Sequence, residues 1–93
     1  MAITRINNFE AAEGKGAELH AFLKSVVPLI QAAPGCQACR VLHNQDNARQ
    51  FVVLETWDSV AAHQASMKSI APEKLAEVKP LLAGAPSGAY YAE

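Results

Sequence analysis

The stretch from Gln50 to Ser66 constrains the fold of this chain more than any other. Its first part, QFVVLETW, has apolar side chains at both alternating sets of positions, so a strand formed there has two apolar faces. Both of those faces need cover from water. The pattern becomes helical at Asp58 and Ser59, either of which can cap a helix N-terminus. Helices can cover one face of the sheet, and a second copy of the chain is the simplest cover for the other.

Length and composition favour one small domain that pairs with itself. The chain has 93 residues, of which 51% are apolar, and a single core of this size does not readily hide so many. Eight basic and nine acidic residues are scattered and leave a net charge of −1, so neither nucleic acid nor a membrane is an expected partner. The N-terminus lacks the pattern of a secretion signal, and no apolar run approaches the roughly 18 residues that span a bilayer. We therefore expect a cytoplasmic homodimer of one domain, residues 1–93.

Hydrophobic periodicity predicts the order strand, helix, strand, strand, helical region, strand. This order is the split βαβ arrangement of ferredoxin-like folds, an α+β class with an antiparallel sheet. The predicted strands cover residues 3–9, 36–43, 50–57 and 89–92, and the predicted helical segments cover residues 17–33, 60–70 and 72–82. A kink or local irregularity is expected at Pro28, because proline removes a backbone donor from the helix.

His63 is the first candidate for chemistry, because its imidazole lies on the apolar stripe of the helix predicted after Trp57. Such a ring either finds a hydrogen-bond partner in the core or faces a cavity, where it can accept a proton or contact a ligand. Trp57 likewise suits both a core corner and a pocket rim that offers its indole N–H. Asn7 and Asn8 are unusual inside a strand, and a buried amide needs partners, so one of them is expected at a cavity or subunit boundary.

The other reactive residues do not indicate a catalytic or cofactor site. Cys36 and Cys39 form a C-x-x-C on a strand, where residues three apart point to opposite faces, so neither a redox pair nor a metal site is expected. Arg40 and Glu55 lie on neighbouring strands and are interpreted as a cross-strand ion pair. Residues 14–16, GKG, lack the loop and hydroxyl of a phosphate site, so no nucleotide cofactor is indicated.

These features together resemble the antibiotic biosynthesis monooxygenase family over nearly the whole chain. The matching pieces are the first strand ending before Gly14, AAPGC at 32–36, FVVLETW at 51–57, DSVAAHQAS at 58–66 and LLAGAPSGAYY at 81–91. The resemblance implies ferredoxin-like monomers that pair through their sheets into a dimeric α+β barrel, with a cleft between sheet and helices in each subunit. The activities it implies are cofactor-free oxygenation of phenols and quinols and, in related proteins, haem binding and breakdown.

The chain departs from the family pattern in two places. The usual family histidine falls nine residues after the strand-end tryptophan, where this chain has Ser66, and His63 comes one helical turn earlier. An aromatic residue common in the second strand is replaced by Cys39. Asn7, in contrast, matches the pocket asparagine of the haem-degrading relatives by its distance to Gly14.

The leading hypothesis is a cofactor-independent monooxygenase that oxidises a small electron-rich aromatic or quinol with dioxygen. His63 would accept the proton, and Asn7 and the Trp57 indole would hydrogen-bond the developing oxyanion. The residues expected to contact the substrate are Phe22, Ser66, Met67 and Tyr91, and no metal or cofactor is expected. Two alternatives stay open: a non-catalytic or stress-related dimer that binds a small apolar molecule, and a haem-binding or haem-degrading protein.

Overall fold

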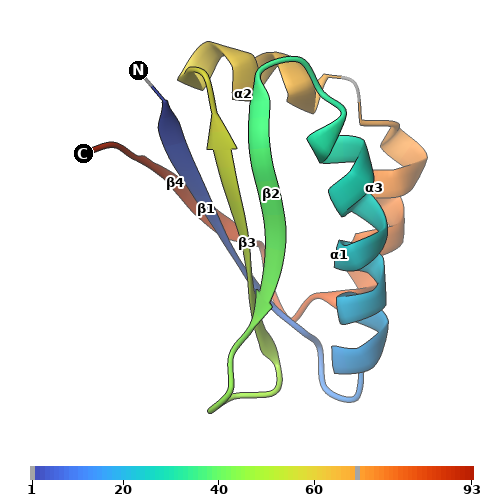
Figure 1. Cartoon of the computed structure of the whole chain (residues 1–93). Helices are drawn as coiled ribbons and strands as arrows, with labels where there is room; N and C mark the ends of the chain where they lie inside the picture. Colours follow the sequence, from blue (N-terminus) through green and yellow to red (C-terminus); the bar gives the residue numbers. More distant parts are fainter. Residues whose placement is uncertain (1, 69) are drawn as a thin grey trace.

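The fold is an antiparallel sheet with helices on one side (Figure 1). The structure is a computed structural model and describes residues 2–68 and 70–93. The elements in chain order are β1 (Ile3–Glu10), α1 (Gly16–Gln31), β2 (Cys36–His43), β3 (Gln50–Trp57), α2 (Val60–Met67), α3 (Pro72–Val78), the short 3-10 helix η1 (Lys79–Leu81) and β4 (Ser87–Tyr91). This arrangement confirms the predicted α+β, ferredoxin-like class.

The strands are ordered β2-β3-β1-β4 in the sheet, and each neighbouring pair is antiparallel. The register places Glu55 of β3 beside Arg5 of β1 and Cys39 of β2, while Arg5 in turn lies beside Tyr90 of β4. Because side chains opposite one another share a face, these four residues form one row across the same side of the sheet. We call that side, which α1 covers, the inner face.

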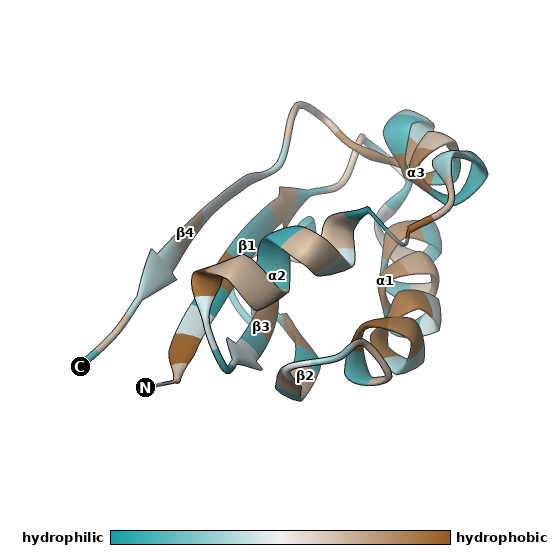
Figure 2. Cartoon of the chain, turned by 90° about the horizontal axis from the view of Figure 1, so that it is seen from above, coloured by the Kyte–Doolittle hydropathy of each residue, from teal (hydrophilic) through white to brown (hydrophobic). Residues whose placement is uncertain are grey.

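Burial along β3 follows the period of a strand. Phe51, Val53, Glu55 and Trp57 are buried on the inner face, and Leu19 and Leu23 of α1 belong to the same core cluster as Phe51 and Val53. Seen from above the sheet, all helices lie on one side of it (Figure 2). The core therefore lies between the inner face and the helices.

The opposite side, here called the outer face, carries the alternate residues of β3. Val52 and Leu54 are only half-buried, while Leu42 of β2 and Tyr91 of β4 are 42% and 54% exposed. Within residues 2–68 and 70–93, no helix packs over this side (Figure 2). A partly apolar surface is left facing solvent.

Local signals explain how the elements begin and end. Ser59 caps α2 through its Oγ, which accepts from the backbone N–H of Ala62 at 3.1 Å. Gly35 makes the turn into β2 with φ of 88°, and a Cβ there would lie 2.7 Å from Cβ of Ala62. α1 runs as one helix through Pro28, so the irregularity expected there does not break it: Pro28 is exposed and lies in the last turn, where water can solvate the freed carbonyl.

Two expectations about the second strand were wrong. A register shift between Cys36 and Ala38 lets Cys36 pair with Trp57 and Cys39 pair with Glu55, so both cysteines belong to the inner face. A β-bulge of this kind adds a residue to one strand and resets the alternation.

The same register separates the expected ion pair. Arg40 pairs with Leu54 on the outer face, whereas Glu55 points to the inner face. The terminal strand also begins earlier than expected, at Ser87. None of the helices in the described part of the chain is long and apolar enough to cross a membrane.

Candidate functional site

A buried carboxylate organises the inner face near its upper end. Glu55 is 4% exposed, and one oxygen accepts from Nε1 of Trp57 at 2.8 Å while the other accepts from Nδ2 of Asn7 at 2.9 Å. Each oxygen of Glu55 therefore accepts from its own donor, one on β1 and one two residues further along β3. Such pairing is what makes a buried acid tolerable, because an unpaired one would pay a large desolvation cost.

The environment of Glu55 changes its acidity. Burial raises the pKa of this carboxyl above its ordinary value, and the hydrogen bond from Trp57, the charge of Arg5 and the hydrogen bond from Asn7 act in the opposite direction. Desolvation is the largest of these causes, so the net shift is upward. Glu55 is consequently a better proton acceptor than an exposed glutamate.

His63 of α2 faces the same carboxylate. This residue is 6% exposed, with Nε2 3.9 Å from Oε1 of Glu55 and Nδ1 2.6 Å from the hydroxyl of Tyr90. The ring also meets the rings of Trp57 and Tyr90 edge-on. Burial, and secondly the charge of Arg5, lower the pKa of His63, so the imidazole is neutral at pH 7 and able to accept a proton.

Arg5 completes the group from β1. Its Nε donates to Oδ1 of Asn7 at 2.9 Å, and its guanidinium lies 4.7 Å from the centre of the Tyr90 ring. Gly88 on β4 leaves room for both, because a Cβ there would lie 2.5 Å from Nη2 of Arg5 and from Oδ1 of Asn7. We call the six residues Arg5, Asn7, Glu55, Trp57, His63 and Tyr90 the inner-face cluster.

Three residues predicted to act together do lie together. Asn7, Trp57 and His63 all belong to the inner-face cluster, whereas Asn8 is exposed on the other side of β1. Sequence reasoning did not place Glu55 or Tyr90 in the site. The alternation of β3 could have indicated Glu55, because Glu55 lies two residues before Trp57 and so points to the same face.

The residues expected to contact substrate are more scattered. Ser66 donates from Oγ to the backbone oxygen of His63 at 2.6 Å, and Phe22 is half-buried on α1 beneath the Lys74 ammonium. Met67 is 55% exposed at the end of α2, and Tyr91 lies on the outer face. The structure therefore brings Ser66 near the cluster and leaves Met67 and Tyr91 away from it.

An apolar cleft of about 530 Å³ opens beside α2. It lies between the end of α1 and the segment joining α2 to α3, and its lining residues are Val26, Leu29, Ile30, Ala32, Ala33, Pro34, Ser66, Ile70, Ala71 and Lys74. Ser66 links this cleft to His63, which precedes it by about one helical turn. The cleft is large enough for a small aromatic molecule.

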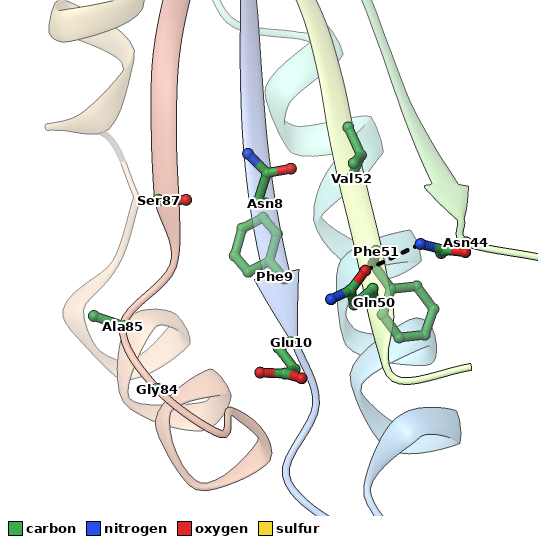
Figure 3. Close-up of a pocket in the computed structure, with 10 residues that line it drawn as sticks. All are labelled: Asn8, Phe9, Glu10, Asn44, Gln50, Phe51, Val52, Gly84, Ala85 and Ser87. Atoms are coloured by element: carbon green, nitrogen blue, oxygen red, sulfur yellow. Dashed lines mark hydrogen bonds between the residues drawn. The ribbon is translucent and has the colours of Figure 1, made fainter. Parts of the chain in front are cut away.

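A second cleft, of about 450 Å³, lies at the far end of the sheet (Figure 3). Asn8, Val52 and Ser87 line it from the outer face, and Asn44 donates from Nδ2 to Oε1 of Gln50 at 3.0 Å at its edge. None of its lining residues belongs to the inner-face cluster. This cleft is more polar and is remote from the buried acid and imidazole.

The cysteines and histidines of the described residues, 2–68 and 70–93, do not assemble into a metal-binding group of three. Burial raises the pKa of the Cys39 thiol to about 12, with the Glu55 charge as the second cause. Burial also raises the pKa of Cys36. Both thiols therefore stay protonated at pH 7, which makes them poor nucleophiles.

Comparison with known proteins decides the family. A family model described as antibiotic biosynthesis monooxygenase matches residues 2–83. The chain belongs to this family. No curated protein matches the chain.

Solved structures share the family fold over nearly the full length of this chain. Rv0793 from Mycobacterium tuberculosis is 20% identical with a TM-score of 0.85, covering 100% of this chain and 95% of its own. NE2512 from Nitrosomonas europaea, a protein of unknown function, is 27% identical with a TM-score of 0.83, covering 97% and 86%. SnoaB from Streptomyces nogalater, described as a cofactor-independent oxygenase, is 16% identical with a TM-score of 0.82, covering 99% and 92%.

Proposed function

We propose that this protein is a cofactor-independent monooxygenase that oxidises a small electron-rich aromatic or quinol with dioxygen. The observation that carries the proposal is the neutral imidazole of His63, held in a buried site between the Tyr90 hydroxyl and the Glu55 carboxylate. Membership of the family and the described activity of the structurally similar SnoaB support the reaction class.

The reaction needs little from the protein beyond a base and a dry site. A phenol whose keto tautomer carries a CH₂ group loses a proton to the base, and the resulting anion can pass an electron to dioxygen. One oxygen atom becomes the new carbonyl, the other leaves as water, and the substrate CH₂ supplies all four electrons. His63 accepts the proton, and the apolar surroundings exclude water from the reactive anion.

Asn7 and Trp57 have a different role in this proposal from the one expected. The single N–H of the Trp57 indole and one of the two N–H groups of the Asn7 amide are directed to oxygens of Glu55. We assign them to holding the carboxylate beside His63. The apolar cleft ends at Ser66, and no residue of the inner-face cluster lines it.

A homodimer is part of the proposal. The outer face exposes apolar side chains from three strands, among them Leu42, Leu54 and Tyr91. Pairing two copies through this face would remove that surface from water, which is a favourable contribution of roughly 25 cal/mol for each Å² buried.

Oxygen uptake is the direct test of the proposed function. A panel of quinols and anthrones is offered to the purified protein in an oxygen electrode, and ¹⁸O₂ should label one atom of the product. His63→Ala should abolish turnover with little loss of fold, while the control His20→Ala, which removes a half-buried imidazole from α1, should retain it. Unchanged turnover in His63→Ala would remove His63 from the mechanism.

The apolar cleft also supports a second candidate, a non-catalytic dimer that binds a small apolar molecule. Binding of hydroxylated aromatics without oxygen uptake or product would favour that function. Haem binding has weaker support, because Nδ1 of His63 already bonds Tyr90 and the ring is buried. A haem titration that shifts the absorption band would revive it.

A further inference from the structure

We infer that Tyr90 is the residue that meets the substrate, and that Tyr90, His63 and Glu55 form a proton relay across the inner face. The inference rests on the proposed function and names a catalytic residue that the sequence patterns did not indicate. Its basis is a line of three groups contributed by β4, α2 and β3. The line runs from the hydroxyl of Tyr90 through both nitrogens of His63 to Glu55.

The surroundings of His63 favour one tautomer, although Nε2 lies 3.9 Å from Oε1 of Glu55, beyond hydrogen-bond distance. Nε2 faces Oε1 of Glu55, which is an acceptor already bonded by Trp57, so a proton on Nε2 is favoured over a lone pair there. Nδ1 then carries the lone pair and accepts from the hydroxyl of Tyr90 at 2.6 Å. The base of the site therefore acts first on Tyr90, because that hydroxyl occupies the free lone pair of His63.

Exposure gives the relay its direction. Glu55 and His63 are almost fully buried, whereas Tyr90 is half-buried on β4, at the edge of the sheet. A substrate can thus reach the phenol without displacing the packed imidazole or carboxylate. In this geometry Tyr90 is the catalytic residue, and His63 and Glu55 act through it.

The charged groups around the relay act in both directions, because the Arg5 charge that lowers the pKa of His63 also stabilises an anion on the phenol. The Arg5 guanidinium on β1 lies 4.7 Å from the centre of the Tyr90 ring, where it stabilises negative charge on the phenol oxygen. The Glu55 carboxylate on β3 stabilises positive charge on His63, as a carboxylate does for a catalytic imidazolium. From β2 the facing group is the Cys39 thiol, which burial keeps uncharged.

The proton balance of the step is simple. The hydroxyl of Tyr90 passes its proton to Nδ1 of His63 as the substrate hydroxyl passes its own to the oxygen of Tyr90. The products are a substrate anion, a neutral tyrosine and an imidazolium whose Nε2 proton faces Glu55. Dioxygen then oxidises the anion as in the proposed function, and the stored proton returns along the same path to the oxygen that leaves as water.

Tyr90→Phe and Tyr91→Phe form a matched pair for the test, because the two tyrosines are adjacent but lie on opposite faces. Loss of a positioned acid–base group should lower kcat by about 10²- to 10³-fold in Tyr90→Phe with KM nearly unchanged. Tyr91→Phe should stay within about twofold of wild type, since its hydroxyl is not in the relay. Equal kcat in the two variants would overturn the relay while leaving the proposed function intact.

Glu55→Gln tests the far end of the relay through the pH profile. Removing the negative charge beside His63 should move the acid limb of kcat to lower pH, because the imidazolium loses its stabilising partner. A variant with reduced kcat and an unmoved acid limb would mean that Glu55 has a structural role only, and would overturn its place in the relay.

One measurement is independent of turnover and of how variants fold. The ¹⁵N chemical shifts of His63 in the wild-type protein distinguish its two neutral tautomers. The relay requires the proton on Nε2, and a proton on Nδ1 would overturn it. Absence of oxygen uptake by the wild-type protein with every phenol tested would instead refute the proposed function, and the relay with it.

Discussion

The two faces of β3 differ in what surrounds them, although they carry similar side chains. On the inner face, Phe51 and Val53 are buried under α1, whereas on the outer face Val52 and Leu54 are only half-buried. Because side chains alternate along β3, half of this apolar stretch lies in the core of the chain. The other half lies on a surface that the described part of the chain does not itself cover. The helices account for the first, and pairing of two copies accounts for the second in our proposal.

Polar residues follow the same division with a sharper contrast. Arg40 and Asn8 on the outer face are exposed, where water can solvate them. Glu55 and His63 on the inner face are buried, and each has partners from other elements. Polar groups on the inner face persist only with such partners, because a buried unpaired group costs roughly 1–3 kcal/mol. Their presence there therefore marks the candidate site.

The largest expected effect is on dimerisation through the outer face. Leu54→Glu would place an unpaired charge in the proposed dimer interface, at a cost of about 3–5 kcal/mol for each copy. The dissociation constant of the dimer should rise by at least about 10²-fold, measured by analytical ultracentrifugation. Gln64→Glu, on the exposed side of α2, is the control and should leave the dimer intact. A Leu54→Glu protein that stays dimeric would show that the copies pair elsewhere.

The next largest effect is on the stability of the inner-face cluster. Glu55→Gln keeps the shape but turns an NH₂ group toward one of the two donors that now bond the carboxylate, from Asn7 or Trp57. The free energy of unfolding should fall by about 1–3 kcal/mol at pH 7 in urea denaturation. Glu77→Gln, at an exposed ion pair with Lys74, should change it by less than about 0.5 kcal/mol. Equal values for both variants would contradict the central role of Glu55.

A smaller effect sharpens how closely the inner face is packed. Gly88→Ala would push the side chains of Arg5 and Asn7 away from β4, and should cost about 1 kcal/mol by breaking their hydrogen bond. Gly84→Ala is the matched control, because a Cβ there has no heavy atom within 4 Å. Thermal denaturation compares the two, and a destabilised Gly84→Ala would point to backbone effects instead.

The smallest effect concerns pH. Because burial lowers the pKa of His63, the unfolded chain binds a proton there more readily than the folded protein as pH falls below about 6.5. Stability is therefore fully present above that value and is lost as pH falls toward the lower pKa of the folded state. In His63→Gln the loss between pH 7 and 5.5, measured by urea denaturation, should be smaller than in wild type. Burial also lowers the pKa of His20, so this histidine still contributes a loss of stability at low pH in the His63→Gln variant.

Local patterns were enough to predict much of the fold. The strands Cys36–His43 and Gln50–Trp57 were predicted with their observed bounds, because alternation and the flanking turns are encoded in neighbouring residues. The Ser59 cap and the first-turn position of Pro72 followed from the same kind of signal. The order of the elements then indicated the ferredoxin-like architecture, and the family resemblance added the dimeric barrel.

The candidate site could be predicted only in part. Asn7, Trp57 and His63 were identified because polar or amphipathic residues stand out in apolar patterns. Tyr91 was chosen where Tyr90 faces the cluster, since a shift of one position in a strand moves a side chain to the opposite face. Met67 was also chosen from a local pattern, the apolar stripe of the helix. It is exposed in the structure, because α2 ends at this residue and no other element among the described residues covers it.

The sequence by itself determined the element order, the two-sided apolar strand and the family of this protein, because each of these depends on residues close together along the chain. Only the tertiary structure decided that Glu55 sits between Asn7 and Trp57, that both cysteines share one face, and that Tyr90 reaches His63. Those facts depend on strand register and on one bulge. Register between β1 and its neighbours β3 and β4 depends on segments far apart in the chain, and the bulge in β2 shifts the register within its hairpin with β3.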